Sequence, residues 1–149
     1  MFDEKDLLSP EGRILSLWMG KTDKSYDDFC AYFEGMEASD PSCPALRSLG
    51  ATFIDVDFFV FYVTPGMKPV TVTELLKEVG CSKDSEKLIL EKCKAIGLDE
   101  GNALFYYPGA IFKGDESALY NDLHFIGVFD SIDKDVKWNG KTWVPRNNE

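Results

Sequence analysis

The sequence lacks the motifs of most catalytic sites. It has a single histidine, His124, no Cys-x-x-Cys pair and no Gly-x-Ser-x-Gly motif, and its stretch from Gly109 to Gly114 lacks the Lys-Ser or Lys-Thr of a phosphate-binding loop. A hydrolase that activates serine or cysteine needs a base aimed at its nucleophile, and His124 is the sole imidazole for that role. Widely spaced cysteines do not offer the short-range ligand pairs of a zinc site. We therefore predict no catalytic residue, no resident metal and no cofactor, and we expect the chain not to be an enzyme.

Long apolar runs are also missing. Residues 1–12 carry four acidic side chains and only one apolar pair, and no later stretch is long enough to span a membrane. This pattern predicts a cytoplasmic protein. In that reducing compartment the four cysteines are expected to remain thiols that pack as small apolar side chains: Cys30, Cys43, Cys81 and Cys93.

Basic residues are scarce. The chain has 16 Lys and Arg against 26 Asp and Glu, a formal net charge of −10. Such a surface repels nucleic acid and anionic membranes and attracts basic proteins. Between Lys24 and Lys68 there are seven acids and one base, a net charge of −6, whereas both signs are intermixed beyond residue 75. A segment of one sign is typical of a docking surface; the alternative is that acidity serves only solubility.

The chain is expected to fold as one domain over residues 1–149. Its hydrophobic residues (44%) and aromatic residues (13%) suffice for a sizeable core. Runs rich in β-branched and aromatic residues predict strands over 14–19, 52–64, 103–107 and 123–129. A hairpin or loop is expected over 111–116, and Asn139-Gly140, between Trp138 and Trp143, predicts a tight turn.

Four helices are predicted between these strands. Their start and stop signals place them over 26–38, 44–49, 72–79 and about 84–96. The residues expected to face inward are Tyr26, Phe29, Cys30, Phe33, Met36, Ile89, Cys93 and Ile96. The order of elements predicts an α+β fold in which helices pack on a central, mostly antiparallel sheet.

One pair of carboxylates suggests chemistry. Asp55 and Asp57 lie two residues apart on the predicted 52–64 strand, which directs both side chains to one face, about 6–7 Å apart. A bulge near Asp57 would let the strand enter the core, where Phe58 is expected to lie with Trp18. Two carboxylates at that spacing could bind a divalent cation or act as acid and base. A small metal-dependent hydrolase using Asp55, Asp57 and His124 is therefore an alternative.

Three blocks of the sequence carry a family resemblance. The first is LSLWMG at 15–20, followed by Phe29 and Tyr32; the second is LGATFIDVDF at 49–58; the third is LHFIGVF at 123–129. In their order and spacing, from about residue 14 to 130, these blocks resemble the immunity protein 22 family of bacterial polymorphic toxin systems. The pair Phe59-Val60 departs from it, since the family has a more polar, acidic pair there.

The resemblance implies a cytoplasmic antitoxin, a monomer or small homo-oligomer that binds a cognate toxin and blocks it. Such toxins are often nucleases, whose active sites are basic, so an acidic inhibitor is electrostatically suited to cover them. A DNA-mimicking regulator that captures another basic protein is a further alternative. The residues expected to contact the toxin are Asp27, Glu34, Asp55 and Asp57, with Asp115 and Glu116 as secondary candidates.

Overall fold

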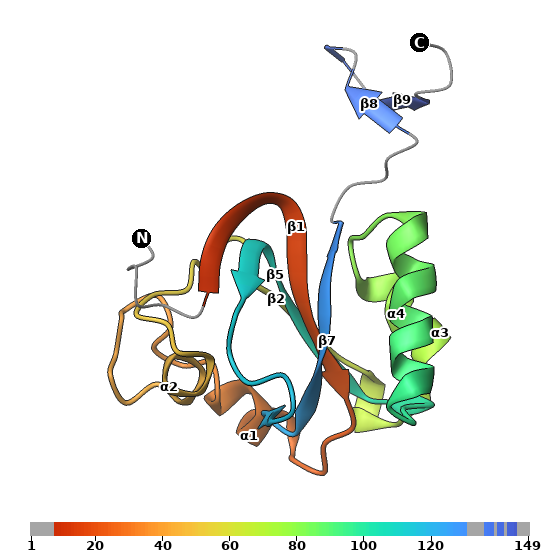
Figure 1. Cartoon of the computed structure of the whole chain (residues 1–149). Coiled ribbons are helices and arrows are strands. Elements are labelled where there is room, and N and C mark those ends of the chain that lie inside the picture. Colours follow the sequence, from red (N-terminus) through yellow and green to blue (C-terminus); the bar gives the residue numbers. More distant parts are fainter. Residues whose placement is uncertain (1–7, 131–135, 139, 142, 146–149) are drawn as a thin grey trace.

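The structure is a computed structural model that describes residues 8–130, 136–138, 140–141 and 143–145 (Figure 1). Its centre is a curled five-stranded sheet in the order β2-β5-β1-β7-β6, in which every neighbouring pair is antiparallel. With the helices that pack on it, this sheet confirms the predicted α+β class. In sheet order the strands are Val60–Val63 (β2), Ala103–Phe112 (β5), Leu8–Gly20 (β1), Leu123–Asp130 (β7) and Leu119–Tyr120 (β6).

Residues 15–19 of the central strand β1 are buried on both faces of the sheet. Leu17 and Met19 belong to one hydrophobic core and Trp18 to the other, and all three side chains are fully buried. The alternation continues in β5, where Leu104 joins Leu17 while Phe105 stacks on Trp18 with ring centroids 4.8 Å apart. Because successive side chains of a strand point to opposite faces, the sheet separates two cores, named here the Leu17 core and the Trp18 core.

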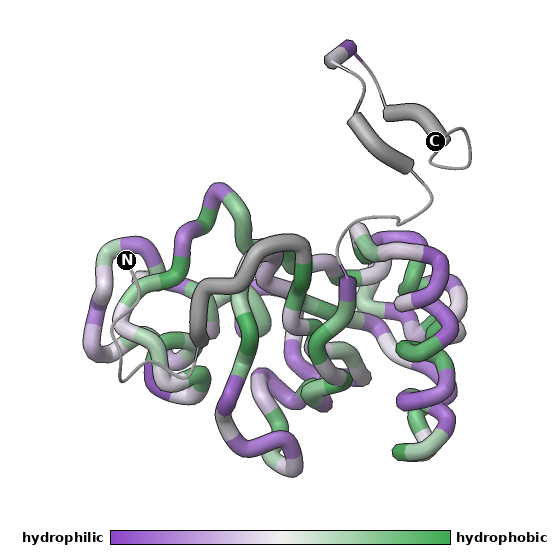
Figure 2. The backbone as a smooth tube through the Cα atoms, turned by 45° about the horizontal axis from the view of Figure 1, so that its top comes forward, coloured by the Kyte–Doolittle hydropathy of each residue, from purple (hydrophilic) through white to green (hydrophobic). Residues whose placement is uncertain are grey.

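Each core is covered by its own helices. In Figure 1, α1 (Tyr26–Ala31) and α2 (Pro44–Leu49) lie on one side of the sheet, and α3 (Val72–Leu75) and α4 (Lys83–Ala95) lie on the other. Hydrophilic and hydrophobic residues alternate along α4 in Figure 2, as expected for a helix with one buried side. Among the described residues, no helix has the length and apolarity needed to cross a membrane. The Trp18 core is covered by α1 and α2, and the Leu17 core by α3, the 3-10 turn η2 (Leu76–Glu78) and α4.

Two further strand pairs lie outside the main sheet. The strands β3 and β4 are antiparallel, and so are β8 and β9, in which Trp138 lies opposite Trp143. The tight turn predicted at Asn139-Gly140 falls partly outside the described residues, because Asn139 is not among them. A short 3-10 turn, η1, follows β2. The bounds are Pro65–Met67 (η1), Val70–Thr71 (β3), Glu100–Gly101 (β4), Val136–Trp138 (β8) and Trp143–Pro145 (β9).

The first helix is shorter than the predicted range of 26–38. Ser25 caps it as expected, accepting a hydrogen bond from the backbone N–H of Asp28. It ends at Ala31 because the Tyr32 carbonyl accepts from the Ala45 N–H of α2 at 2.9 Å, and because Gly35 adopts a φ of 93° that no α-helix contains. The predicted helix was therefore too long, but three of its apolar residues are buried: Phe29, Phe33 and Met36.

The later helices largely follow the prediction. Thr71 caps α3 by accepting from the Glu74 N–H, but the helix tightens to 3-10 geometry at Leu76 instead of continuing to residue 79. Two residues expected to face inward are exposed, Tyr26 by 53% and Ile96 by 39%. Both lie at a helix end, where the 3.6-residue repeat no longer fixes the direction of the side chain.

The predicted strand over 52–64 is mostly wrong. Only Val60–Val63 pairs in the sheet, and a loop and a turn replace the first eight residues. The expected bulge near Asp57 is a full reversal of the chain, and Phe58, expected in the core with Trp18, is 61% exposed. The residue pattern that predicts a strand reflects only the apolar, aromatic and β-branched character of the side chains. It does not indicate the hydrogen bonds that fold this segment into a turn.

The strand β5 runs five residues beyond its predicted end. Ser16, fully buried in β1, donates from its hydroxyl to the Ala110 carbonyl (2.8 Å) and accepts from the Phe112 N–H (2.9 Å). These bonds lie where the β1–β5 register shifts, between Pro10 and Leu15. The hydroxyl thus holds the strands together through the shift, and the loop expected over 111–116 begins only after Phe112.

A buried amide joins three segments at one end of the sheet. The Asn102 side chain accepts from the Thr22 N–H (2.9 Å) and donates to the carbonyls of Thr22 (2.8 Å) and Met67 (3.0 Å). Asn102 is 2% exposed, so water cannot replace these partners without the structure opening. One side chain therefore satisfies three backbone groups in the loops that follow β1 and β2.

We predict that Asn102→Ala lowers the free energy of unfolding by about 2–3 kcal/mol, because buried backbone groups lose their partners. Urea unfolding followed by tryptophan fluorescence measures the change. Thr73→Ala, at an exposed position of α3, is the control and should shift the free energy by less than about 0.5 kcal/mol. Equal stability of the two variants would show that the amide contributes nothing.

Candidate functional site

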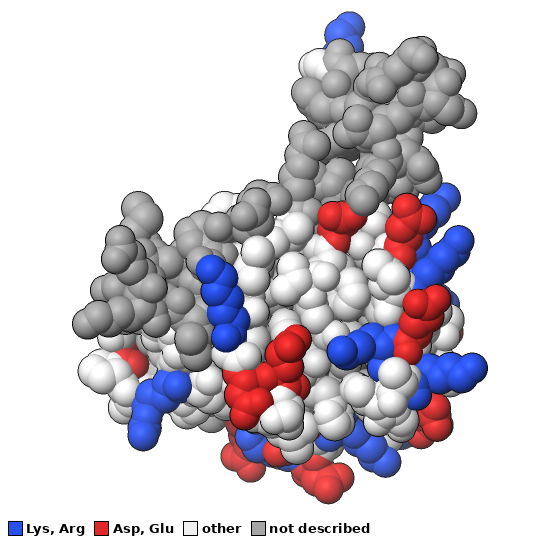
Figure 3. All heavy atoms as spheres, viewed as in Figure 1, with Lys and Arg blue, Asp and Glu red and all other residues white. Residues whose placement is uncertain are grey.

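The six acidic residues predicted to bind a partner lie on three separate parts of the surface. All are exposed except Asp55, which is half-buried. Figure 3 shows acidic and basic side chains side by side over α4, so that side of the molecule has no single sign. The six residues are Asp27 in the first turn of α1, Glu34 just after that helix, Asp55 and Asp57 before β2, and Asp115 and Glu116 between β5 and β6.

The two aspartates before β2 lie in a tight turn, not on a strand. The backbone N–H groups of Phe58 and Phe59 both donate to the Asp55 carbonyl, at 3.1 and 3.0 Å. The Asp55 carboxylate accepts from the Asp57 N–H at 3.0 Å, which is the local bond by which aspartate favours turns. Asp55 thus accepts three bonds from its own segment, and the predicted same-face strand geometry is corrected accordingly.

Contacts with the Trp18 core hold the turn at both ends. The Asp55 N–H donates to the Tyr107 hydroxyl of β5 at 2.9 Å, and the N–H of the fully buried Ile54 donates to the Met36 carbonyl at 3.3 Å. At the other end Phe59 is 9% exposed, with its ring 5.6 Å from that of Phe105. Because both ends are anchored, the position of the carboxylates is set by the sheet.

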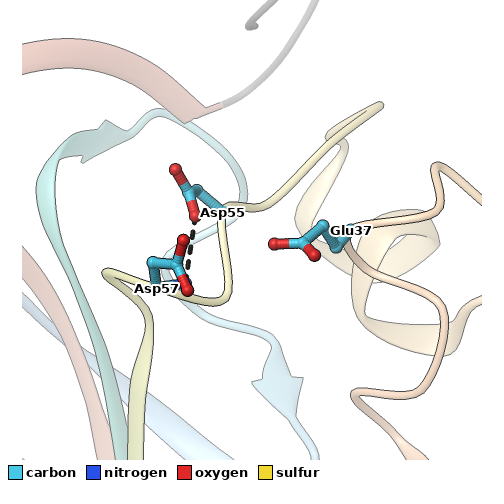
Figure 4. A group of neighbouring side chains, drawn as sticks. All are labelled: Glu37, Asp55 and Asp57. Carbon is cyan, nitrogen blue, oxygen red and sulfur yellow. Dashed lines mark hydrogen bonds between the residues drawn. The ribbon is translucent and has the colours of Figure 1, made fainter.

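A third carboxylate joins the pair. Oxygen atoms of Glu37, Asp55 and Asp57 all lie within 4.8 Å of one another, with Glu37 reaching in from the segment between α1 and α2 (Figure 4). Among the described lysines and arginines, none forms a salt bridge with these three groups. Glu37 was not predicted as a contact residue, because it lies eighteen positions before Asp55 in the sequence. The backbone bond between Met36 and Ile54 brings the two segments together. Three close negative charges attract a cation, whether a metal ion or the side chain of a basic partner.

The other predicted acids are outside this cluster. Asp115 accepts from the hydroxyl (2.6 Å) and the N–H (2.9 Å) of Ser117, and these bonds hold the pKa of the Asp115 carboxyl below its ordinary value. Its own carbonyl accepts from the Tyr120 hydroxyl at 2.6 Å. Asp115 therefore organises its loop, and the structure does not bring it, Glu116, Asp27 or Glu34 into the carboxylate group.

The single histidine and the cysteines are not part of the carboxylate group. His124 is half-buried on β7 opposite Met19. All four cysteines are free thiols. Burial raises the pKa of Cys81 and of Cys93 to about 11, so both stay protonated and unreactive at neutral pH.

Two hollows on the surface lie apart from the predicted residues. One, of about 320 Å³, is lined by Tyr26 and residues 62–67; the other, of about 290 Å³, lies between residues 39–41 and the end of α2. Neither is lined by Asp55, Asp57 or His124. The carboxylate turn is thus exposed outside these hollows, a placement better suited to a macromolecule than to an enclosed small substrate.

No protein-family model matches the chain, and comparisons with curated proteins and with solved structures also found no match. The function is therefore argued from the geometry of the site.

We predict that Tyr107→Phe loosens the turn, since the Asp55 N–H loses its acceptor. The free energy of unfolding should fall by about 1 kcal/mol, and the Asp55 amide should exchange its hydrogen faster. Hydrogen exchange monitored by NMR measures this effect. Tyr106→Phe is the matched control, because its hydroxyl accepts from the Gly80 N–H in the other core. An unchanged Asp55 exchange rate in Tyr107→Phe would mean that the hydroxyl does not hold the turn.

Proposed function

We propose that the protein is a cytoplasmic immunity protein that binds and neutralises a cognate bacterial toxin with a basic, nuclease-type active domain. The observation that carries this proposal is the anchored turn that presents Asp55 and Asp57 beside Glu37 at the surface. A basic active site that binds a polyanion offers lysine and arginine side chains to such carboxylates. Inhibition then requires only that the site be covered, and no catalytic group is needed on the inhibitor.

Charge and rigidity support the same conclusion. The net charge of −10 steers a basic partner toward the protein and raises the association rate. The turn is held by the sheet before the partner arrives, so little conformational entropy is lost on binding. Both properties suit an inhibitor that must capture a toxin before it acts.

We predict that Asp55→Lys with Asp57→Lys slows association with the toxin at least about tenfold at low salt. The reason is that two negative charges at the contact become positive, which changes the local net charge by four units. The probe is the inactivated toxin domain that the proposed function expects the adjacent upstream reading frame to encode, and stopped-flow fluorescence measures the association rate. Cells expressing the active toxin should lose protection, while the variant remains folded by circular dichroism.

The matched control is Glu86→Lys with Glu91→Lys, which makes the same change of charge on the exposed face of α4. This control should retain protection. It should lower the association rate only through its effect on the net charge of the protein. If both double variants behaved alike, steering would be general and the turn would not be the contact.

The carboxylate group also favours a second function, a metal-dependent hydrolase. Glu37, Asp55 and Asp57 are hard oxygen ligands within 4.8 Å of one another, and such ligands suit Mg²⁺ or Mn²⁺. Titration calorimetry with Mg²⁺, Mn²⁺ and Zn²⁺ separates the two functions. We expect no saturable heat for an immunity protein. A one-to-one heat that Glu37→Gln abolishes would support the hydrolase instead.

A further inference from the structure

The turn that carries the carboxylates also exposes two apolar side chains. Phe58 is 61% exposed and Val56 is 45% exposed, and they alternate with Asp55 and Asp57 along the chain. Single exposed apolar residues are common on protein surfaces and indicate nothing by themselves. Here the exposure is enforced by the fold, and the nearby carboxylates of Glu37, Asp55 and Asp57 form no salt bridge with a described lysine or arginine.

The neighbour of Phe58 explains why its ring cannot turn inward. Phe59 occupies the core position, with its ring 5.3 Å from Phe33, 5.6 Å from Phe105 and 5.8 Å from Tyr107. The Phe58 N–H is bonded to the Asp55 carbonyl, so the backbone of the turn is fixed on the side of Phe58 as well. The core is filled by one phenylalanine, and the other is held in solvent.

We propose that Phe58 is the apolar anchor of the partner interface and inserts into an apolar pocket bordered by lysine or arginine on the toxin. This inference rests on the proposed function and names the surface that performs it. The basic character of the partner is inferred from charge. Glu37, Asp55 and Asp57 lie around the base of the turn, and no described lysine or arginine forms a salt bridge with them. A basic partner both neutralises these carboxylates and removes the ring from water.

Interfaces of this kind concentrate their affinity in few residues. Large aromatic anchors at the centre dominate, and charged groups at the rim mainly set the association rate. Phe58 is therefore expected to govern dissociation, whereas the carboxylates govern association. The two contributions are separable by kinetics.

A second exposed apolar residue offers a matched control. Leu88 is 55% exposed on α4. Its neighbours one turn away include Asp84 and Glu91 but also Lys92, so its surroundings are of mixed sign. Leu88→Ala removes a comparable exposed side chain without touching the turn.

The experiment compares Phe58→Ala, Phe58→Glu and Leu88→Ala by surface plasmon resonance against the immobilised, inactivated toxin domain from the adjacent upstream reading frame. Phe58→Ala should raise the dissociation rate at least about tenfold, and Leu88→Ala less than about twofold. Phe58→Glu adds a negative charge, so binding by charge alone would tighten, whereas loss of an anchor weakens it. Thermal unfolding should be unchanged in all three, since both positions are exposed.

The outcomes are distinguishable. If the wild-type protein binds and Phe58→Ala dissociates no faster than Leu88→Ala, or if Phe58→Glu binds more tightly than wild type, the anchor is wrong and the proposed function stands. If the wild-type protein does not bind the toxin domain, the proposed function fails and the anchor fails with it.

Discussion

The structure depends on the burial of β1 between two neighbouring long strands. β5 and β7 both pair with it, and the side chains of residues 15 and 17–19 alternate between two cores, so this part of the strand has no solvent-facing side. Ser16 is the one polar residue of its buried part, and its hydroxyl bonds β5 where the register shifts. The carboxylate turn is positioned from this strand outward. The neighbouring strand β5 carries Tyr107, whose hydroxyl accepts from the Asp55 N–H and so holds the turn that presents the carboxylates.

Sequence patterns predicted the elements that local chemistry determines. The α+β class, β7, α2 and α4 were predicted correctly, and β1 was predicted only from residue 14 although it begins at Leu8. These predictions succeeded because apolar runs and stop signals such as Gly50 act within a few residues. The predictions failed where a contact between residues far apart in the sequence determines the local structure. The helix expected to reach residue 38 stops at Ala31, where α2 takes the Tyr32 carbonyl. The strand expected from residue 52 gives way to a turn that the Tyr107 hydroxyl stabilises from β5.

The candidate site was only half predictable for the same reason. Asp55 and Asp57 were singled out by their spacing, yet the inferred geometry was wrong because both the strand and its faces were misassigned. Glu37 has no local signal at all, since a backbone bond between Met36 and Ile54 brings it to the pair. Phe58 and Phe59 are identical in type and adjacent, and no property of the sequence tells which one fills the core. That assignment needs the ring positions of Phe33, Phe105 and Tyr107.

The division into two cores has a consequence for how such a protein can change over generations. The turn, α1 and α2 rest on the Trp18 core, whereas α3 and α4 rest on the Leu17 core, and the sheet lies between them. Substitutions in the carboxylate turn that cost stability are tolerated only while the chain stays above its folding threshold. Because the Leu17 core lies on the opposite face of the sheet, such substitutions leave its packing untouched. One layer can therefore vary in sequence while the other preserves the fold.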